Sequence, residues 1–147
     1  MTASSTDALA YLSFVDAAKR IRAKDLAPVE YCESLLRRIE AINPSLDAFL
    51  EVTSEQAMME ARAAAEAVER GESLGPMHGV PFALKDIIDA AGLPTTAHSK
   101  ILAENVAVTD AHVTERLRAA GAILLGKLST HEFAFGGPCF DLPWPPA

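Results

Sequence analysis

The sequence predicts an α/β fold, in which N-terminal amphipathic helices precede the start of a mixed, largely parallel sheet covered by helices. Apolar residues recur at helical spacing through the first half of the 147-residue chain. The second half contains two short apolar runs with a helical pattern between them. A strand, a helix and a second strand in this order favour two parallel strands. The length fits one domain.

Two amphipathic helices are predicted in the first 45 residues. Ser13 has the position of an N-cap, and Asp16 follows three residues later, which predicts a helix over residues 14–24. Pro28 suits the first position of a second helix, whose apolar stripe runs over the next four turns. We expect the pair Asn43-Pro44 to end this helix.

A short strand and a third helix are predicted next. Residues 48–52 carry three apolar side chains and fit a strand. Thr53 and Gln56 have the spacing of a capping box ahead of the alanine-rich helix expected over 57–70. Gly71 is suited to the left-handed conformation that commonly closes a helix.

The sheet is predicted from two apolar runs. Residues 80–84 stop abruptly at Lys85, as a buried strand does at its carboxyl end. Asp110 is the expected cap of a helix that Gly121 closes, and residues 122–125 form the second run. Functional side chains of open α/β sheets gather at the carboxyl ends of the strands.

Composition limits the partners and the compartment. Thirteen basic and 20 acidic residues give a net charge of −7, which disfavours direct contact with nucleic acid. No uncharged apolar run reaches the roughly 18 residues that span a bilayer, so no membrane partner is expected. Cys32 and Cys139 lie far apart and have no metal-ligand spacing. We therefore expect reduced thiols and a cytoplasmic location.

Three weaker patterns are set aside. Gly121 to Lys127 match part of a phosphate-binding loop, but Leu128 stands where a hydroxyl would ligate magnesium, so no nucleotide cofactor is expected. No signature pairs Cys139 with a base. The four histidines lack a recognised ligand spacing, so no metal is expected and hydrogen-bonding or surface roles are favoured; they are His78, His98, His112 and His131.

Two lysines stand at the ends of the apolar runs, Lys85 and Lys127. Partial burial there would disfavour the ammonium form. A lysine that acts as a base near neutral pH needs its pKa lowered from about 10.4 to roughly 7 or 8. A second interpretation is that Lys85 stays charged and pairs with Asp86 or Asp89. The residues alone favour this second interpretation. For Lys127 a structural role is favoured more strongly.

A series of short motifs resembles the amidase signature family in order and spacing. Residues 39–49 look like the N-terminal region of that family, so the resemblance covers nearly the whole chain. The motifs are Gly75-Pro-Met-His-Gly-Val-Pro-Phe-Ala-Leu-Lys85-Asp86, Thr95-Thr96, Asp110-Ala111, Ala120-Gly-Ala-Ile-Leu-Leu-Gly-Lys127 and Glu132-Phe-Ala-Phe-Gly136.

The resemblance implies an amidase that hydrolyses a carbon–nitrogen bond of a small-molecule amide. Family members use a nucleophilic serine, a second serine and a lysine, and Lys85 stands at the position of that lysine. The implied role of Lys85 is to take the proton of the nucleophile through the second serine. The resemblance implies no cofactor, and Lys127 is given a structural role.

The glycine- and serine-rich segment that supplies both serines in the family is not found in residues 1–147. We therefore expect this chain to be the N-terminal portion of a single amidase domain, truncated before that segment and inactive alone. Two alternatives remain open. One is the A subunit of a tRNA-dependent amidotransferase, which moves ammonia toward a charged tRNA, and the other is a non-catalytic fragment. The apolar front helices could form a homodimer contact.

Overall fold

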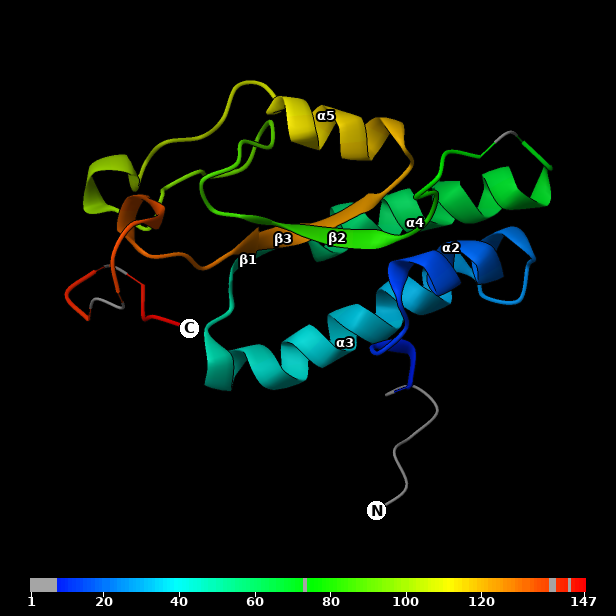
Figure 1. Cartoon of the computed structure of the whole chain (residues 1–147), viewed down its shortest axis with the longest axis horizontal. Helices are drawn as coiled ribbons and strands as arrows, with labels where there is room; N and C mark the ends of the chain where they lie inside the picture. The colour runs from blue at the N-terminus through cyan, green and yellow to red at the C-terminus, as the bar shows by residue number, and fades with distance from the viewer. Residues whose placement is uncertain (1–7, 73, 138–139, 143) are drawn as a thin grey trace, which may run out of the picture.

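The computed structural model of the chain describes residues 8–72, 74–137, 140–142 and 144–147. Figure 1 shows helix α5 on one face of a three-stranded sheet and helices α3 and α4 on the other, with α2 beside them. The strand order is β1-β3-β2, with one antiparallel and one parallel pairing. The predicted α/β class with a mixed sheet is therefore confirmed.

The first predicted helix is α2, which spans Phe14–Arg22. The hydroxyl of Ser13 accepts a hydrogen bond from the Asp16 amide (3.1 Å) and donates to the Asp16 carboxylate (2.7 Å). These two bonds confirm the predicted cap, because they satisfy an amide that the helix leaves without a partner.

The second helix, α3, spans Pro28–Leu46 and runs past the pair Asn43-Pro44, so the predicted end was wrong. Proline near the end of a helix removes only one amide donor, and the chain turns at Asp47, whose φ is 50°. The Asn43 side chain accepts from the Phe49 amide (2.7 Å) and donates to the Phe49 carbonyl (3.0 Å). Asn43 thereby joins α3 to the following strand.

Strand β1 (Phe49–Val52) and helix α4 (Ser54–Glu69) lie where the sequence predicted a strand and a helix. The capping box was wrong. The Thr53 hydroxyl donates to the carbonyl oxygen of Leu124 (2.8 Å), and the Gln56 amide donates to Glu60 (2.9 Å). A tertiary partner on the neighbouring strand therefore replaces the local one.

Strands β2 (Pro81–Lys85) and β3 (Ile123–Leu128) are parallel, and α5 (His112–Ala119) precedes β3, which confirms the predicted β-α-β order. Asp110 does not cap α5, whose N-cap is Ala111. The Asp110 carboxylate instead accepts from the Ala91 amide (2.7 Å) and pairs with Arg118 (3.0 Å). The carboxylate therefore joins the loop after β2 to α5.

The two faces of β3 pack in different cores, as alternation along a strand requires. Ile123 and Leu125 pack with Cys32 of α3 and with the alanines of α4. Leu124 points the other way and packs with Leu84 of β2 and with residues near α5. The small side chains of α4 let this helix approach the sheet closely, which explains its alanine-rich sequence.

A β-bulge interrupts this alternation. Phe82 lies opposite Leu124 and Leu84 lies opposite Lys127, so β3 has one more residue than β2 over this stretch. An extra residue turns all later side chains to the opposite face. Lys127 consequently lies on the face of Leu124 and Leu84 rather than on the face of Leu125.

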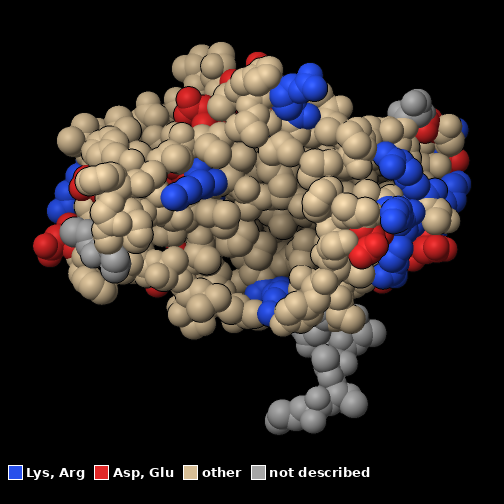
Figure 2. Space-filling view, viewed as in Figure 1, with Lys and Arg blue, Asp and Glu red and all other residues tan. Residues whose placement is uncertain are grey.

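Two short 3₁₀ helices, η1 (Lys100–Leu102) and η2 (Glu132–Ala134), lie in the segments beyond the carboxyl ends of β2 and β3. Within the described ranges, no helix is long and apolar enough to cross a membrane. On the face seen in Figure 2, several basic side chains gather at one end with acidic side chains beside them, and the others stand singly among uncharged residues.

Candidate functional site

Lys85 is the last residue of β2 and its side chain is exposed. Its carbonyl oxygen accepts from the amides of Ile87 (2.8 Å) and Ile88 (2.9 Å), so the chain turns directly after the strand. Among the described residues, no side chain forms a hydrogen bond or an ion pair with the Lys85 amine. The ion pair with Asp86 or Asp89, left open by the sequence, is therefore absent, and the expected partial burial of Lys85 is not found in this chain.

Asp86 pairs with Lys127 instead. The Lys127 Nζ atom lies 3.0 Å from Asp86 Oδ1, and both residues are 1% exposed. The pair joins the ends of two parallel strands, since Asp86 follows β2 and Lys127 lies in β3. The bulge in β3 makes this contact possible, because it turns Lys127 toward the face of the sheet on which Leu84 lies. Asp86 comes two residues after Leu84 and therefore points to the same face.

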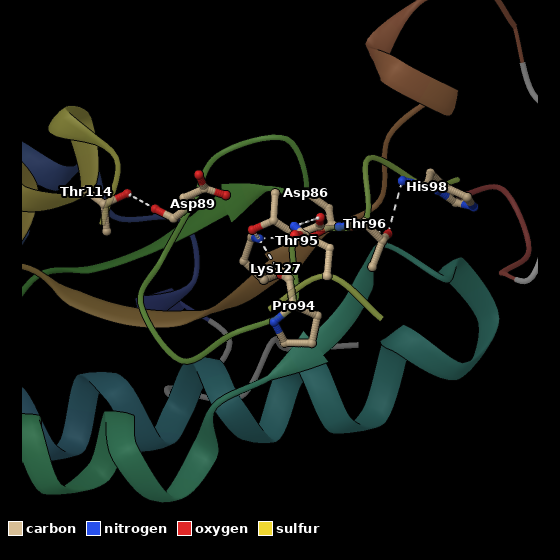
Figure 3. A network of polar contacts seen from close by, with 9 residues as sticks. Asp86, Asp89, Pro94, Thr95, Thr96, His98, Thr114 and Lys127 are labelled. Atoms are coloured by element: carbon tan, nitrogen blue, oxygen red, sulfur yellow. Dashed lines mark hydrogen bonds and ion pairs between the residues drawn. The ribbon is translucent and has the colours of Figure 1, made fainter. Parts of the chain in front are cut away.

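The loop after β2 completes the coordination of both charges (Figure 3). Lys127 Nζ donates to the Pro94 carbonyl (2.7 Å) and to the Thr95 hydroxyl (2.9 Å). Lys127 Nζ thus has two hydrogen-bond acceptors and one ion-pair partner, the Asp86 carboxylate. The amide of Thr96 (3.0 Å) and its hydroxyl both donate to Asp86 Oδ2. Each buried charge is therefore compensated by an opposite charge and by hydrogen bonds.

The main chain of Asp86 is also fixed on both sides. Its amide donates to the Leu128 carbonyl (2.9 Å), which continues the parallel ladder, and its carbonyl accepts from the Ala97 amide (2.8 Å). Asp86 is thus held through its amide, its carbonyl and both carboxylate oxygens. Because Lys85 is the preceding residue, the point from which its side chain leaves the backbone is fixed as well.

The loop carries an unusual backbone at Ala97 and His98, whose φ angles are 50° and 57°. This left-handed region is disfavoured for residues with a Cβ, so contacts around the loop must compensate for it. The His98 amide donates to the Thr96 hydroxyl (3.1 Å), and the Ala97 carbonyl accepts from the Phe133 amide (2.9 Å). The segment with Ala97 and His98 is therefore held against Asp86 on one side and η2 on the other.

The histidine rings and serines of this region have structural partners. His98 Nε2 donates to the Trp144 carbonyl (2.9 Å), and His98 Nδ1 lies 3.4 Å from the hydroxyl of Ser129. Ser99 donates to Glu132 (2.7 Å). The ring of His78 lies 2.9 Å from the Ala64 carbonyl. Over the described ranges, no group of three or more metal-binding side chains comes together.

Cys32, the cysteine within the described residues, contributes no reactive thiol to this region. Cys32 is buried in α3, and burial together with the charge of Glu60 raises the pKa of its thiol to about 11. A thiol with so high a pKa is a poor nucleophile at neutral pH. Cys139 lies outside the described residues.

At the carboxyl ends of β2 and β3 the described residues place one exposed amine, that of Lys85, and no serine is hydrogen-bonded to it. The sequence correctly predicted that Lys85 ends a strand. It favoured a structural role for Lys127, which the structure places in a buried ion pair with Asp86. It considered Asp86 only as a partner of Lys85 and assigned no role to Thr95 and Thr96. A signal was present, because a lysine directly after an apolar run needs an acidic partner if the strand is buried.

The α/β fold carries its motifs at the carboxyl ends of the strands. Comparisons with known proteins identify the family to which such a chain belongs. The Amidase family matches residues 30–141, and the chain belongs to this family. An acylamidase of Rhodococcus erythropolis is 40% identical over 129 residues, which are 88% of this chain and 27% of the relative. The A subunit of a glutamyl-tRNA(Gln) amidotransferase from Streptomyces coelicolor is 47% identical over 125 residues, 85% of this chain and 25% of the relative.

Solved structures agree with this assignment. The peptide amidase of Stenotrophomonas maltophilia superimposes with a TM-score of 0.77 at 35% identity, over 84% of this chain and 26% of that one. A second structure comes from a vestigial protein complex that reveals the evolutionary origins of an s-triazine catabolic enzyme. It superimposes with a TM-score of 0.82 at 38% identity, over 86% of this chain and 28% of that one. The chain thus spans about a quarter of the length of the relatives it matches.

Proposed function

We propose that residues 1–147 form the N-terminal portion of an amidase domain, and that the complete domain hydrolyses a small-molecule amide with Lys85 as general base. The observation that carries the proposal is the position of Lys85. It ends β2 within the motif Gly79-Val-Pro-Phe-Ala-Leu-Lys85, its amine has no partner among the described residues, and its backbone is anchored through Asp86. Function in open α/β sheets concentrates at such strand ends.

The chemistry needs groups that the described residues do not supply. An amide is a poor electrophile, so its hydrolysis requires a serine activated by a base. The neutral Lys85 amine would accept the proton of the nucleophile through an intermediate serine and later return it to the leaving amine. We propose that both serines belong to a glycine- and serine-rich segment of the remaining domain. The coverage of about a quarter of each relative supports this proposal.

The remaining domain has a second task in this proposal. Lys85 is exposed in the described chain, whereas the proposed base must be uncharged. Burial under the rest of the domain would disfavour an ammonium form and favour the neutral base. The Lys85 amine is not committed to an ion pair, so no carboxylate among the described residues opposes this change.

The test replaces Lys85 by Ala in the complete protein and measures kcat and KM on simple aryl amides. We expect kcat to fall by several powers of ten, because the proton acceptor is lost. Lys100→Ala is the matched control, since Lys100 is an exposed lysine in η1 and has no role in the proposal. Near-normal turnover by the Lys85 variant, with the control also active, would remove Lys85 from the mechanism.

A second candidate is the A subunit of a tRNA-dependent amidotransferase. Relatives of this kind reach 47% identity, compared with 40% for the acylamidase. In this alternative the amide is that of glutamine and the released ammonia is passed on within a complex. Glutamine hydrolysis that appears only with partner subunits would favour it, whereas hydrolysis of aryl amides by the isolated protein would favour the first candidate.

The remaining expectations are also proposals. We place the protein in the cytoplasm, without direct contact with nucleic acid or membrane, in line with its net charge of −7. A homodimer through the front helices is compatible with a groove of about 340 Å³ between α3 and β1, lined mainly by apolar side chains. Sedimentation of the complete protein would test this dimer.

A further inference from the structure

We infer that the buried ion pair between Asp86 and Lys127 positions Lys85 for proton transfer, so that both residues are positioning residues of the reaction. The inference rests on the proposed function, because it assigns the pair a role toward the base named there. Neither Asp86 nor Lys127 is assigned contact with the substrate.

Two opposite charges are buried together at the ends of β2 and β3. Asp86 and Lys127 are both withdrawn from water, and each depends on the other for compensation. Two apolar residues of similar size would stabilise a fold equally well or better. Stability alone therefore does not explain why a charge pair stands here. A charge pair differs from an apolar contact in that it fixes direction and distance.

A short covalent path joins the ion pair to the proposed base. Asp86 directly follows Lys85, and Asp86 is held at its amide, its carbonyl and both carboxylate oxygens. Lys127 directly precedes Leu128, which lies opposite Lys85 in the sheet. The Leu128 carbonyl accepts a hydrogen bond from the Asp86 amide. Any displacement of the pair is therefore transmitted to the backbone from which the Lys85 side chain departs.

Unfavourable backbone conformations support the contact between Asp86 and Lys127. The bulge in β3 turns Lys127 toward Asp86, and the loop places Ala97 and His98 in the left-handed region while the Ala97 amide bonds to Asp86. Such backbone features persist only where surrounding contacts determine them. Both features converge on Asp86, and Figure 3 shows the resulting network around the ends of the strands.

The test uses the complete protein with four variants: Asp86→Asn, Lys127→Met, the double variant that combines them, and Thr114→Val as the control. Thr114 is fully buried, and its hydroxyl donates to the Asp89 carbonyl (2.7 Å), so it anchors the same loop from α5 without touching the pair. Each variant is assayed for kcat and KM on the amide that the parent hydrolyses best, and for its unfolding midpoint in urea.

Each single variant leaves one buried charge uncompensated, so we expect lower unfolding midpoints together with a loss in kcat of about 100-fold, the effect of a displacement of roughly 1 Å. KM should stay within about twofold, since the pair does not touch substrate. In the double variant no uncompensated charge remains, so its midpoint should recover while kcat stays low. Thr114→Val should lower the midpoint and leave kcat unchanged.

The results separate the two levels of inference. Restoration of kcat along with the unfolding midpoint in the double variant would show that the pair serves folding only, and would overturn the inference. If the single variants fail to fold, the double variant alone decides. An active Lys85→Ala variant, or a parent without amide turnover, would overturn the proposed function and this inference with it. Loss of activity in Lys85→Ala with full kcat in the charge-pair variants would overturn this inference only.

Discussion

Gly126 of β3 lies so close to the carbonyl oxygen of Glu51 in β1 that a Cβ atom at this position would overlap it. Val52 is the register partner of Gly126, and the φ of Gly126 is 150°. The glycine occupies the bulge that turns Lys127 toward Asp86. The absence of a side chain at Gly126 is therefore a condition for the buried ion pair.

Replacing Gly126 by Ala should destabilise the fold by about 3 kcal/mol, the upper part of the range for overpacked sites, because backbone on both strands must move. Denaturant unfolding of the complete protein measures this change. Gly92→Ala is the matched control. Its φ is also positive (81°), but no atom lies within 4 Å of an added Cβ, so only the conformational cost of about 1 kcal/mol should appear. Equal losses in both variants would contradict the role given to the close contact.

Local signals predicted most of the fold. The cap at Ser13, the proline at the start of α3 and the two apolar runs each depend on residues near one another in the sequence, and the structure has all of these elements. The two wrong caps share one cause. Thr53 and Asp110 both have cap-like spacing, but each side chain found a partner distant in the sequence, Leu124 and Arg118 respectively. Tertiary contacts of this kind leave no local pattern.

The site was predictable in part for the same reason. Lys85 is conspicuous at the end of an apolar run, and the motif around it could be read directly. The ion pair between Lys85 and Asp86 was considered without Lys127. The bulge at Gly126 shifts the register of β3 by one residue, so that Lys127 and not Lys85 pairs with Asp86. Strict alternation from Leu125 would place Lys127 on the face of α3 and α4, away from Asp86. A bulge of this kind cannot be derived from periodicity.

The Cys32 thiol should make stability depend on pH in alkaline solution. Burial, followed by the charge of Glu60, raises the pKa of this thiol from 9.0 to about 11 in the folded chain. The unfolded chain therefore loses the proton at lower pH than the folded chain. The contribution of the protonated Cys32 thiol to the free energy of unfolding is complete below pH 9 and is lost as pH rises through about 11. We expect a loss of about 1 to 2 kcal/mol between pH 8.5 and pH 10.5.

Urea unfolding of the parent and of Cys32→Ala at several pH values measures this effect. Cys32→Ala should be less stable at neutral pH because it leaves a cavity between α3 and α4, but its stability should decline less steeply with pH. Burial also raises the pKa of the neighbouring Tyr31, so Tyr31→Phe is included to separate the two groups. Parallel pH profiles of the parent and the Cys32 variant would contradict the prediction.

Residues 1–147 alone should hydrolyse no amide. In the proposed mechanism Lys85 needs a nucleophile, and the serines near the carboxyl ends of β2 and β3 are engaged elsewhere, Ser99 with Glu132 and Ser129 next to His98. Loss of a catalytic nucleophile costs several powers of ten in rate. Release of aromatic amine from an aryl amide is measured at high concentration of the purified chain, with its Lys85→Ala variant as the background. Turnover that exceeds this background would mean that the described residues contain a nucleophile after all, and the proton relay would have to be assigned again within them.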